Sequence, residues 1–275
     1  MKCKHCGKEI DNDSRFCEYC GKKVKTGRLP WWAILLIVLY SLCNVVAVVW
    51  LILNSTGMLA TALGEENAVS VGYVTDYDGN EYNTVQIGNQ CWMAENMRTT
   101  HSRDGKAIAA GGTNSSVTEL YRYAPDNNSD NVEQYGYLYN WAAAQEVCPE
   151  GWHLPTKEDF EELQAYCGEH YAVGGDKEYI AKALASKNGW ESSNDTYSPG
   201  NTPSSNNASG FSAVPAGYYY DGSYGSFGDG AYLWSATPYG SVSAYELSLG
   251  YGYKGTYLNS YYRYLGFSVR CLRDK

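Results

Sequence analysis

The chain lacks any charged residue between positions 31 and 64, and this gap divides its 275 residues into three chemically different parts. Residues 1–30 hold eight Lys/Arg against four Asp/Glu, a net charge of +4. Residues 65–275 hold thirteen Lys/Arg against twenty-six Asp/Glu, a net charge of −13. Phosphate binding needs clustered Lys and Arg, which the long acidic part does not have, so this composition argues against nucleic acid as its ligand.

The uncharged part begins with a run of 23 residues, Trp31 to Leu53. At about 1.5 Å per residue, a helix of this length crosses a hydrocarbon core about 30 Å thick. A buried helix of a soluble domain fits less well, because the run is apolar all round. We expect a transmembrane helix over residues 30–54 and a linker over residues 55–72. Lys and Arg residues precede the run and Glu65 and Glu66 follow it, so we expect a cytoplasmic N-terminus and an extracytoplasmic C-terminal domain, in the periplasm or at the cell surface.

The N-terminal part carries two Cys-x2-Cys-Gly motifs, CKHCG at residues 3–7 and CEYCG at residues 17–21. Four thiolates at this spacing form one tetrahedral Zn²⁺ site, and a closed set of four ligands indicates a structural rather than a catalytic ion. So short a segment buries little core, and the metal must supply about 10 kcal/mol or more of its folding free energy. We therefore predict a zinc ribbon over residues 1–26, whose cytoplasmic partner is unidentified, with the ligands Cys3, Cys6, Cys17 and Cys20.

The C-terminal part shows short strand patterns and three helical ones, at residues 139–148, 155–168 and 178–186. Thr156 with Asp159 predicts the start of the second helix, and Gly168 predicts its end. The run from 192 to 209 is poor in apolar residues and predicts a surface loop. The pairs Asp78-Gly79 and Asp221-Gly222 predict turns. The fold class expected is α+β, with two helices packed on a mainly antiparallel sheet.

Five segments of this part resemble, in order, the successive motifs of the Fibrobacter succinogenes major paralogous domain, and the resemblance spans roughly residues 73–274. It implies a domain over residues 73–275 with a C-type-lectin-like fold, related to the formylglycine-generating, sulfatase-modifying enzymes. The lectin-like pattern also implies a disulfide between Cys148 and Cys271, and it leaves the state of Cys91 and Cys167 open. The segments are DYDGNEYNTVQIGNQCWMAENMR (76–98), CPEGWHLPTKEDFEEL (148–163), GFSAVPAGYYYDG (210–222), LWSATPYG (233–240) and GFSVRCLRD (266–274).

No catalytic residue is predicted. His101, His153 and His170 form no recognisable triad or metal motif, and Cys167 shares an apolar helix face with Phe160. The copper-binding cysteine pair of the sulfatase-modifying relatives is not present, since only Cys271 lies in that region. The carboxylate and amide triplets that hold Ca²⁺ in sugar-binding lectins do not occur either. We expect a binding module, with a structural or assembly role in the envelope as one alternative and an oxidase-like enzyme as another.

Tyrosine is concentrated near the C-terminal end: residues 218–264 hold thirteen of the 27 tyrosines, interleaved with Gly, Ser, Asn and Thr. Tyr offers a large amphipathic contact area with little rotamer entropy to lose, so this mixture predicts a surface for a protein or glycan ligand. The alternative is a Tyr-rich sheet packed on itself around Leu247, Leu249, Leu258, Leu265 and Phe267. The predicted ligand-binding residues are Tyr239, Ser241, Ser243, Tyr245, Tyr251, Tyr253, Tyr257, Asn259, Tyr261 and Tyr262.

The positions of this set, such as Tyr239, Ser241, Tyr251, Tyr257 and Asn259, use only residues that an AAC codon yields when its adenines are rewritten. Some lectin-fold proteins are diversified in this way by a retroelement, and the same process is one interpretation of this C-terminal region. It requires a near-copy of the last coding stretch and a neighbouring reverse transcriptase gene, and their absence would refute it.

Overall fold

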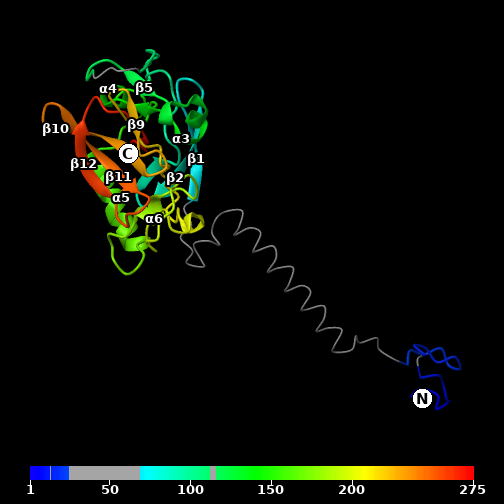
Figure 1. Cartoon of the computed structure of the whole chain (residues 1–275). Coiled ribbons are helices and arrows are strands. Elements are labelled where there is room, and N and C mark those ends of the chain that lie inside the picture. Colours follow the sequence, from blue (N-terminus) through cyan, green and yellow to red (C-terminus); the bar gives the residue numbers. More distant parts are fainter. Residues whose placement is uncertain (13, 25–68, 112–115) are drawn as a thin grey trace. The chain divides into compact units, whose positions relative to one another are not determined.

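The computed structural model describes residues 1–12, 14–24, 69–111 and 116–275 (Figure 1). They belong to two compact units, Met1–Glu65 and Glu66–Lys275, which we describe separately. The transmembrane helix predicted over residues 30–54 lies outside the described residues, as does most of the predicted linker. Within the described ranges, no helix has the length and apolarity needed to cross a membrane.

The described residues of the N-terminal unit form two turns that repeat the same hydrogen bonds. The amide of Gly7 donates to the carbonyl of Cys3 at 2.9 Å, and the amide of Gly21 donates to the carbonyl of Cys17 at 2.7 Å. Both glycines have positive φ, at +75° and +67°, which a side chain would strain. The glycine of each motif therefore sets the tight turn that brings its two cysteines to one side.

The C-terminal unit contains two main sheets and a hairpin, and all strand pairs are antiparallel except β10–β13 and β4–β5. One sheet has the order β1 (Val69–Thr75), β2 (Glu81–Ile87), β3 (Gln90–Met93), β14 (Leu272–Arg273), β7 (Trp152–His153). The second has the order β12 (Tyr257–Tyr262), β11 (Ser243–Gly250), β10 (Gly230–Tyr239), β13 (Phe267–Ser268), β6 (Leu138–Tyr139), β5 (Tyr121–Tyr123), β4 (Ala109–Ala110). The hairpin pairs β8 (Tyr218–Tyr220) with β9 (Ser223–Gly225).

The longest described helix is α5 (Lys157–His170), and its start is as predicted. The Thr156 hydroxyl accepts from the Asp159 amide at 3.1 Å, and the Asp159 carboxylate accepts from the Thr156 amide at 2.8 Å, which completes a capping box. The predicted end at Gly168 is wrong, because the helix continues to His170. Gly168 instead allows close packing, since a Cβ there would lie 2.7 Å from the Lys177 carbonyl oxygen.

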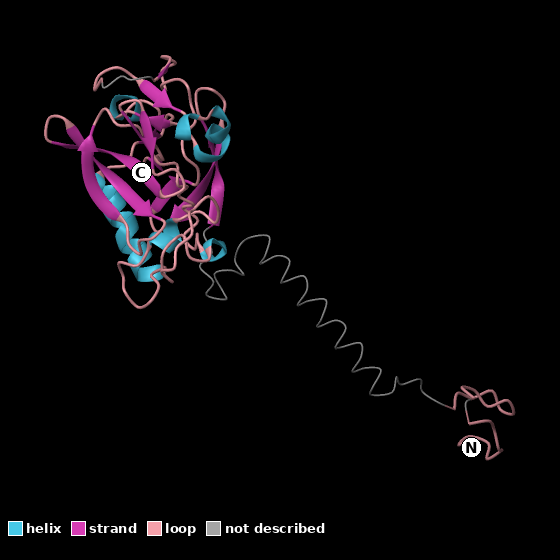
Figure 2. Cartoon of the chain, in the orientation of Figure 1, coloured by secondary structure: helices cyan, strands magenta, loops and turns pink. Residues whose placement is uncertain are grey.

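The other described helices, α3 (Val132–Tyr135), α4 (Trp141–Ala144) and α6 (Ala181–Leu184), are single turns, drawn cyan with α5 in Figure 2. The helices predicted over 139–148 and 178–186 are therefore too long. Tyr139 pairs with Phe267 in the sheet, and the Asn140 side chain accepts from the Ala143 amide at 3.1 Å, so the first of them begins only at Trp141. Sheet pairing has overridden the helical pattern there. The short 3-10 helices are η1 (Pro125–Asn127), η2 (Ser129–Asn131) and η3 (Pro203–Ser205). The unit is thus a mixed α+β domain that consists mostly of sheet.

Strand β10 separates the two largest core clusters. Successive side chains of a strand point to opposite faces, so Leu233 and Trp234 enter different clusters. Trp234 packs with Phe267, whereas Leu233 packs beside Leu247 and helix α5. Of the predicted core residues, Leu247, Leu249, Leu265 and Phe267 are buried and Leu258 is half-buried.

The segment at residues 192–209 is only partly the surface loop that was predicted, because it wraps around a buried ammonium group. Lys182, in α6, is 8% exposed. Its Nζ donates to the backbone carbonyls of residues 198, 201 and 202 and to the Asn206 side-chain oxygen, the last at 3.0 Å. Buried polar groups need hydrogen-bond partners, so the polar side chains of this segment, including Asn206, turn inward where the sequence pattern placed them outside.

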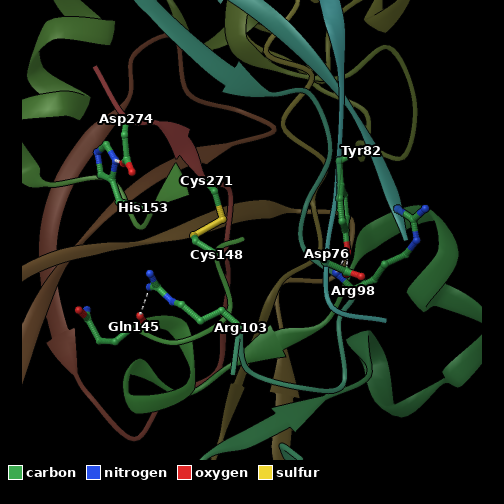
Figure 3. Close-up of a disulfide and its surroundings, with 9 residues drawn as sticks. All are labelled: Asp76, Tyr82, Arg98, Arg103, Gln145, Cys148, His153, Cys271 and Asp274. Atoms are coloured by element: carbon green, nitrogen blue, oxygen red, sulfur yellow. Dashed lines mark hydrogen bonds and ion pairs between the residues drawn. A yellow bond between two sulfur atoms is a disulfide. The ribbon is translucent and has the colours of Figure 1, made fainter. Parts of the chain in front are cut away.

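The C-terminal end of the chain connects the two sheets, because β13 belongs to the second sheet and β14 to the first. Cys271 forms the disulfide with Cys148 that the family resemblance implied (Figure 3). Its neighbour Arg270 is buried, and the guanidinium donates to the Phe211 and Ser212 carbonyls and to the Asn96 side chain, the last at 2.8 Å. Burial lowers the pKa of Arg270, but a guanidinium remains charged at neutral pH. The charge is thus held inside the domain by neutral oxygens.

The disulfide closes a loop with a sequence separation of 123 residues, and its loss should destabilise the domain by about 2–5 kcal/mol. We expect the Cys148→Ala/Cys271→Ala variant to show this loss in chemical denaturation. Reductant should lower the stability of the wild type to that of the variant and leave the variant unchanged. A wild-type protein whose stability does not respond to complete reduction would contradict this prediction.

Candidate functional site

The predicted ligand-binding residues lie on and around β10, β11 and β12, at one edge of the second sheet. The pairing of Leu247 with Leu233 and Leu258 places the leucines on one face of these strands. That face packs on α5 in the core. On the other face, Glu246 lies directly between Trp234 and Asn259. The alternation of the strands thus gives one buried apolar face and one face that carries aromatic and polar groups.

The outermost strand, β12, presents three side chains on this second face: Tyr257, Asn259 and Tyr261. We call these three residues the edge face. Tyr257 is 49% and Tyr261 41% exposed, and Asn259 is also exposed. They recur at every second position because strand side chains alternate. All three were among the predicted ligand-binding residues.

Of the other predicted residues, Tyr253 and Tyr262 adjoin the edge face, and the rest do not all lie in one patch with it. The Tyr239 and Tyr245 rings meet edge to face at 5.4 Å near the β10–β11 turn, which also carries Ser241 and Ser243. Tyr262 ends β12 and stacks on Tyr264 at 5.4 Å. Tyr251 packs against the core, and Tyr253 lies in the β11–β12 connection, with its ring against that of Tyr257. None of the ten predicted residues is buried.

A groove of about 700 Å³ runs between the β11–β12 connection and the segment after α5, and Tyr253 and Tyr257 line it. Lys254 crosses this groove: its Nζ lies 3.4 Å from an Asp195 carboxylate oxygen and 4.9 Å from the centre of the Tyr179 ring. The Gln164 amide donates to the Thr256 hydroxyl at 2.8 Å. The groove is therefore of mixed polarity, and Lys254 and Asp195, which both line it, are already paired with each other.

A second hollow, of about 420 Å³, lies beside β12 and is mostly aromatic. We call it the tyrosine pocket. The β8–β9 hairpin forms part of its wall. The turn predicted at Asp221-Gly222 joins the two strands of this hairpin, and the two residues have φ of +45° and +82°. The aromatic residues that line the pocket are Tyr218, Tyr220, Tyr232, Tyr261, Tyr262 and Phe267.

Glu246 lies behind the tyrosine pocket and is fully buried. Neither carboxyl oxygen has a hydrogen-bond partner, and no described ion pair includes this residue. Burial raises the pKa of Glu246 to about 8, and the neighbouring Ser248 and Asn259 oppose this shift without reaching hydrogen-bond geometry. Near neutral pH the carboxyl is therefore largely protonated, and an unpaired buried acid of this kind indicates a functional position.

The sequence prediction missed Glu246, Tyr218, Tyr220 and Tyr232. Glu246 had a signal, because it alternates with Ala244 and Ser248 opposite the leucines of the same strand. The three tyrosines could be placed beside β12 only once the β8–β9 hairpin was positioned. Arg263 was also left without a role, yet it donates to the Ser243 and Gly240 carbonyls at 2.9 and 3.0 Å and holds the β10–β11 turn.

Two histidines of the C-terminal unit, His101 and His153, pair with carboxylates. His101 Nδ1 lies 2.5 Å from an oxygen of Asp78, and Asp78 belongs to the turn predicted at Asp78-Gly79. His153 Nδ1 faces Asp274 at 2.6 Å (Figure 3), and its Nε2 lies 3.5 Å from Asp159. His170 stacks on Tyr166. Among the described residues, no Ser or Cys side chain forms a hydrogen bond with His101 or His153.

His153 joins the start of α5 to the C-terminal tail, and this contact should depend on pH. Asp159 first, and then Asp274, raise the pKa of His153, so the folded pKa lies above the unfolded one. The contribution to stability is complete below the unfolded pKa and is lost as the pH rises through the folded pKa. We expect Asp274→Asn to lower the free energy of unfolding more at pH 5.5 than at pH 8.5, as measured by urea denaturation. The exposed Asp229→Asn serves as a control, and an effect of D274N that is equal at both pH values would refute the role.

In the N-terminal unit, the four cysteines come together as predicted. Their sulfur atoms all lie within 4.8 Å of one another, with Cys3 and Cys20 at 3.8 Å and Cys6 and Cys17 at 3.5 Å. Four thiolates around one ion with Zn–S bonds of about 2.3 Å would stand about 3.8 Å apart, so the cluster fits a single tetrahedral ion. Cys3 and Cys17 are buried, and His5 is exposed.

Comparison with protein families agrees with both units. Residues 85–273 match the Fibrobacter succinogenes major domain, and residues 2–24 match the zinc-ribbon domain. The chain therefore belongs to the Fibrobacter succinogenes major domain family and begins with a zinc ribbon. No curated protein and no solved structure matches it. The ion that suits the four-cysteine cluster of a zinc ribbon is Zn²⁺, held by Cys3, Cys6, Cys17 and Cys20.

The full-length chain should bind one zinc ion per molecule, measured by elemental analysis of the purified protein. Cys17→Ser should lose it, because three thiolates bind structural zinc far more weakly than four. His5→Ala should retain it, since the cluster is complete without this side chain. Retention of stoichiometric zinc by Cys17→Ser would show that the ion is held elsewhere.

Proposed function

We propose that this chain is a single-pass membrane protein that presents an exported binding domain, and that the edge face contacts a protein or glycan ligand. The zinc ribbon lies in the cytoplasm and meets a partner there, and the span over residues 30–54 connects the two units. The exported unit has a C-type-lectin-like fold. It binds its ligand without catalysis and does not bind nucleic acid.

The state of the cysteines supports placing the two units on opposite sides of a membrane. Cys148 and Cys271 are joined, whereas the four ribbon cysteines are free thiols arranged for a metal. Disulfides persist in oxidising compartments, and thiolate metal sites suit reducing ones. One chain with both features is readily explained if a membrane separates them, as the uncharged run and its flanking charges predict.

The observation that carries the binding proposal is the edge face itself. Tyr257, Asn259 and Tyr261 stand on a strand whose opposite face is anchored in the core by leucines. Their side chains are therefore held in fixed positions while remaining open to solvent. Rigid tyrosines beside a small polar side chain are typical of protein and glycan recognition surfaces.

Diversification by a retroelement remains part of the proposal. The positions with the restricted residue set, which lie between Tyr239 and Tyr262, are all exposed or half-exposed. Most of them lie on turns or on the outermost strand, where exchange among Tyr, Ser, Gly, Thr and Asn leaves the leucine face unchanged.

Replacing the edge face should abolish binding and leave the fold intact. For the full-length Tyr257→Ala/Asn259→Ala/Tyr261→Ala variant we expect a loss of at least about tenfold in affinity for any ligand found on glycan and secreted-protein arrays. Its stability should change by no more than about 0.5 kcal/mol each at Tyr257 and Asn259, which are exposed, and by up to about 1.5 kcal/mol at Tyr261, whose ring also packs on Phe267. Tyr73→Ala is the matched control, since Tyr73 is a 67% exposed tyrosine on a strand of the other sheet. Unfolding of the triple variant would favour a packing role for these tyrosines.

A further inference from the structure

The tyrosine pocket is lined by aromatic rings that touch in series. Tyr218 meets Tyr232 edge to face, with ring centres 5.5 Å apart. Tyr232 stacks on Phe267 at 5.4 Å, and Phe267 meets Tyr261 edge to face at 5.6 Å. No Lys, Arg or His lines this pocket among the described residues. Several π faces and edges therefore surround one space that carries no positive charge of its own.

Glu246 lies on the same strand face as two of these rings. It pairs directly with Trp234 and Asn259, so Tyr232 on β10 and Tyr261 on β12 are its diagonal neighbours. Diagonal neighbours on one face of a sheet stand about 7–8 Å apart. The only carboxyl group in β10, β11 and β12 is thus buried between two rings of the pocket wall, with both oxygens unpaired.

We propose that the tyrosine pocket binds an alkylated ammonium group, with Glu246 as the counter-charge behind the rings. This assigns a ligand class to part of the surface and rests on the proposed binding function. Aromatic rings attract a cation over their faces, and rings that enclose a space do so from several sides. A carboxylate just beyond the rings adds a Coulombic attraction that does not require contact with the ligand.

The absence of strong acceptors in the wall favours an alkylated over a primary ammonium group. A primary ammonium has three donors, and burial without partners costs several kcal/mol. The lining offers the Ser226 hydroxyl and the phenol oxygens but no carboxylate or backbone cage of the kind that surrounds Lys182. A trimethylammonium group has no donor to satisfy and presents only methyl groups to the rings.

The titratable groups that face Glu246 are Tyr232 on β10 and Tyr261 on β12, and burial raises the pKa of both phenols above the ordinary value. Glu246 ionises only near pH 8 in the free protein. A cation in the pocket favours the carboxylate, so binding must release a proton, and affinity must rise with pH across this range. A neutral ligand such as a sugar would release none.

The test uses choline and its uncharged isostere 3,3-dimethylbutan-1-ol with the full-length chain in a maltoside detergent, by isothermal titration calorimetry. At pH 9.0 choline should bind about tenfold more tightly than the isostere. Its affinity should rise on the order of fivefold between pH 6.5 and 9.0. Choline carries a permanent charge, so this change can come only from the protein.

Three variants test which groups of the protein produce the effect. Glu246→Gln should fold, because it resembles the protonated acid, and it should bind choline equally at both pH values. Tyr261→Phe keeps the ring and should bind choline within about twofold of the wild type, whereas Tyr261→Ala should lose most of the affinity. Circular dichroism of each variant confirms that its fold is retained.

Equal binding of choline and its isostere, or no binding of either, would overturn the proposal. A pH response that persists in Glu246→Gln would overturn the role of this residue. If choline fails to bind while the triple variant of the edge face still loses an array ligand, only the ligand class is wrong. If the triple variant loses nothing as well, the binding function itself fails.

Discussion

Hydrogen bonding to backbone carbonyl groups in irregular segments is the interaction on which this domain depends. A domain built from short strands and long connections buries many carbonyl oxygens that no neighbouring strand can satisfy. Among the cationic side chains that donate to them are Lys182, which holds the segment at 198–202, Arg270, which holds Phe211 and Ser212, and Arg263, which holds the β10–β11 turn. The connections are thereby held nearly as firmly as the strands.

The same arrangement explains where a binding surface can form. Because Arg263 holds the turn and the leucines hold one face of the strands, the opposite face can be buried on β11, at Ala244 and Glu246, and exposed on β12. It can carry tyrosines, an asparagine and even an unpaired acid. Glu246 lowers stability where it stands, since an unsatisfied buried carboxyl costs about 1–3 kcal/mol. Glu246 lies beside the proposed ligand pocket, where a bound cation would offset this loss of stability.

The elements that local chemistry controls could be predicted from the sequence. The cysteine motifs, the capping box of Thr156 and Asp159, the turns at Asp78-Gly79 and Asp221-Gly222 and the leucine face all depend on residues close together in the chain. The Cys148–Cys271 pairing needed the family resemblance, because spacing alone leaves several pairings open. Tyr139 could not be recognised as a strand residue, since its partner Phe267 is 128 positions away (267 − 139). The tyrosine pocket depends on three separate segments and was inaccessible for the same reason.

The loop around Lys182 does not need a cation from the solvent to hold its conformation. Loops rich in polar residues often take their shape from a dissolved cation, and they lose that shape when the ion is diluted or chelated. Here the central cation is an ammonium group bonded covalently to the chain, and carbonyl and amide oxygens surround it. The ionic composition of the medium therefore cannot remove it, and the loop keeps its conformation wherever the domain is carried.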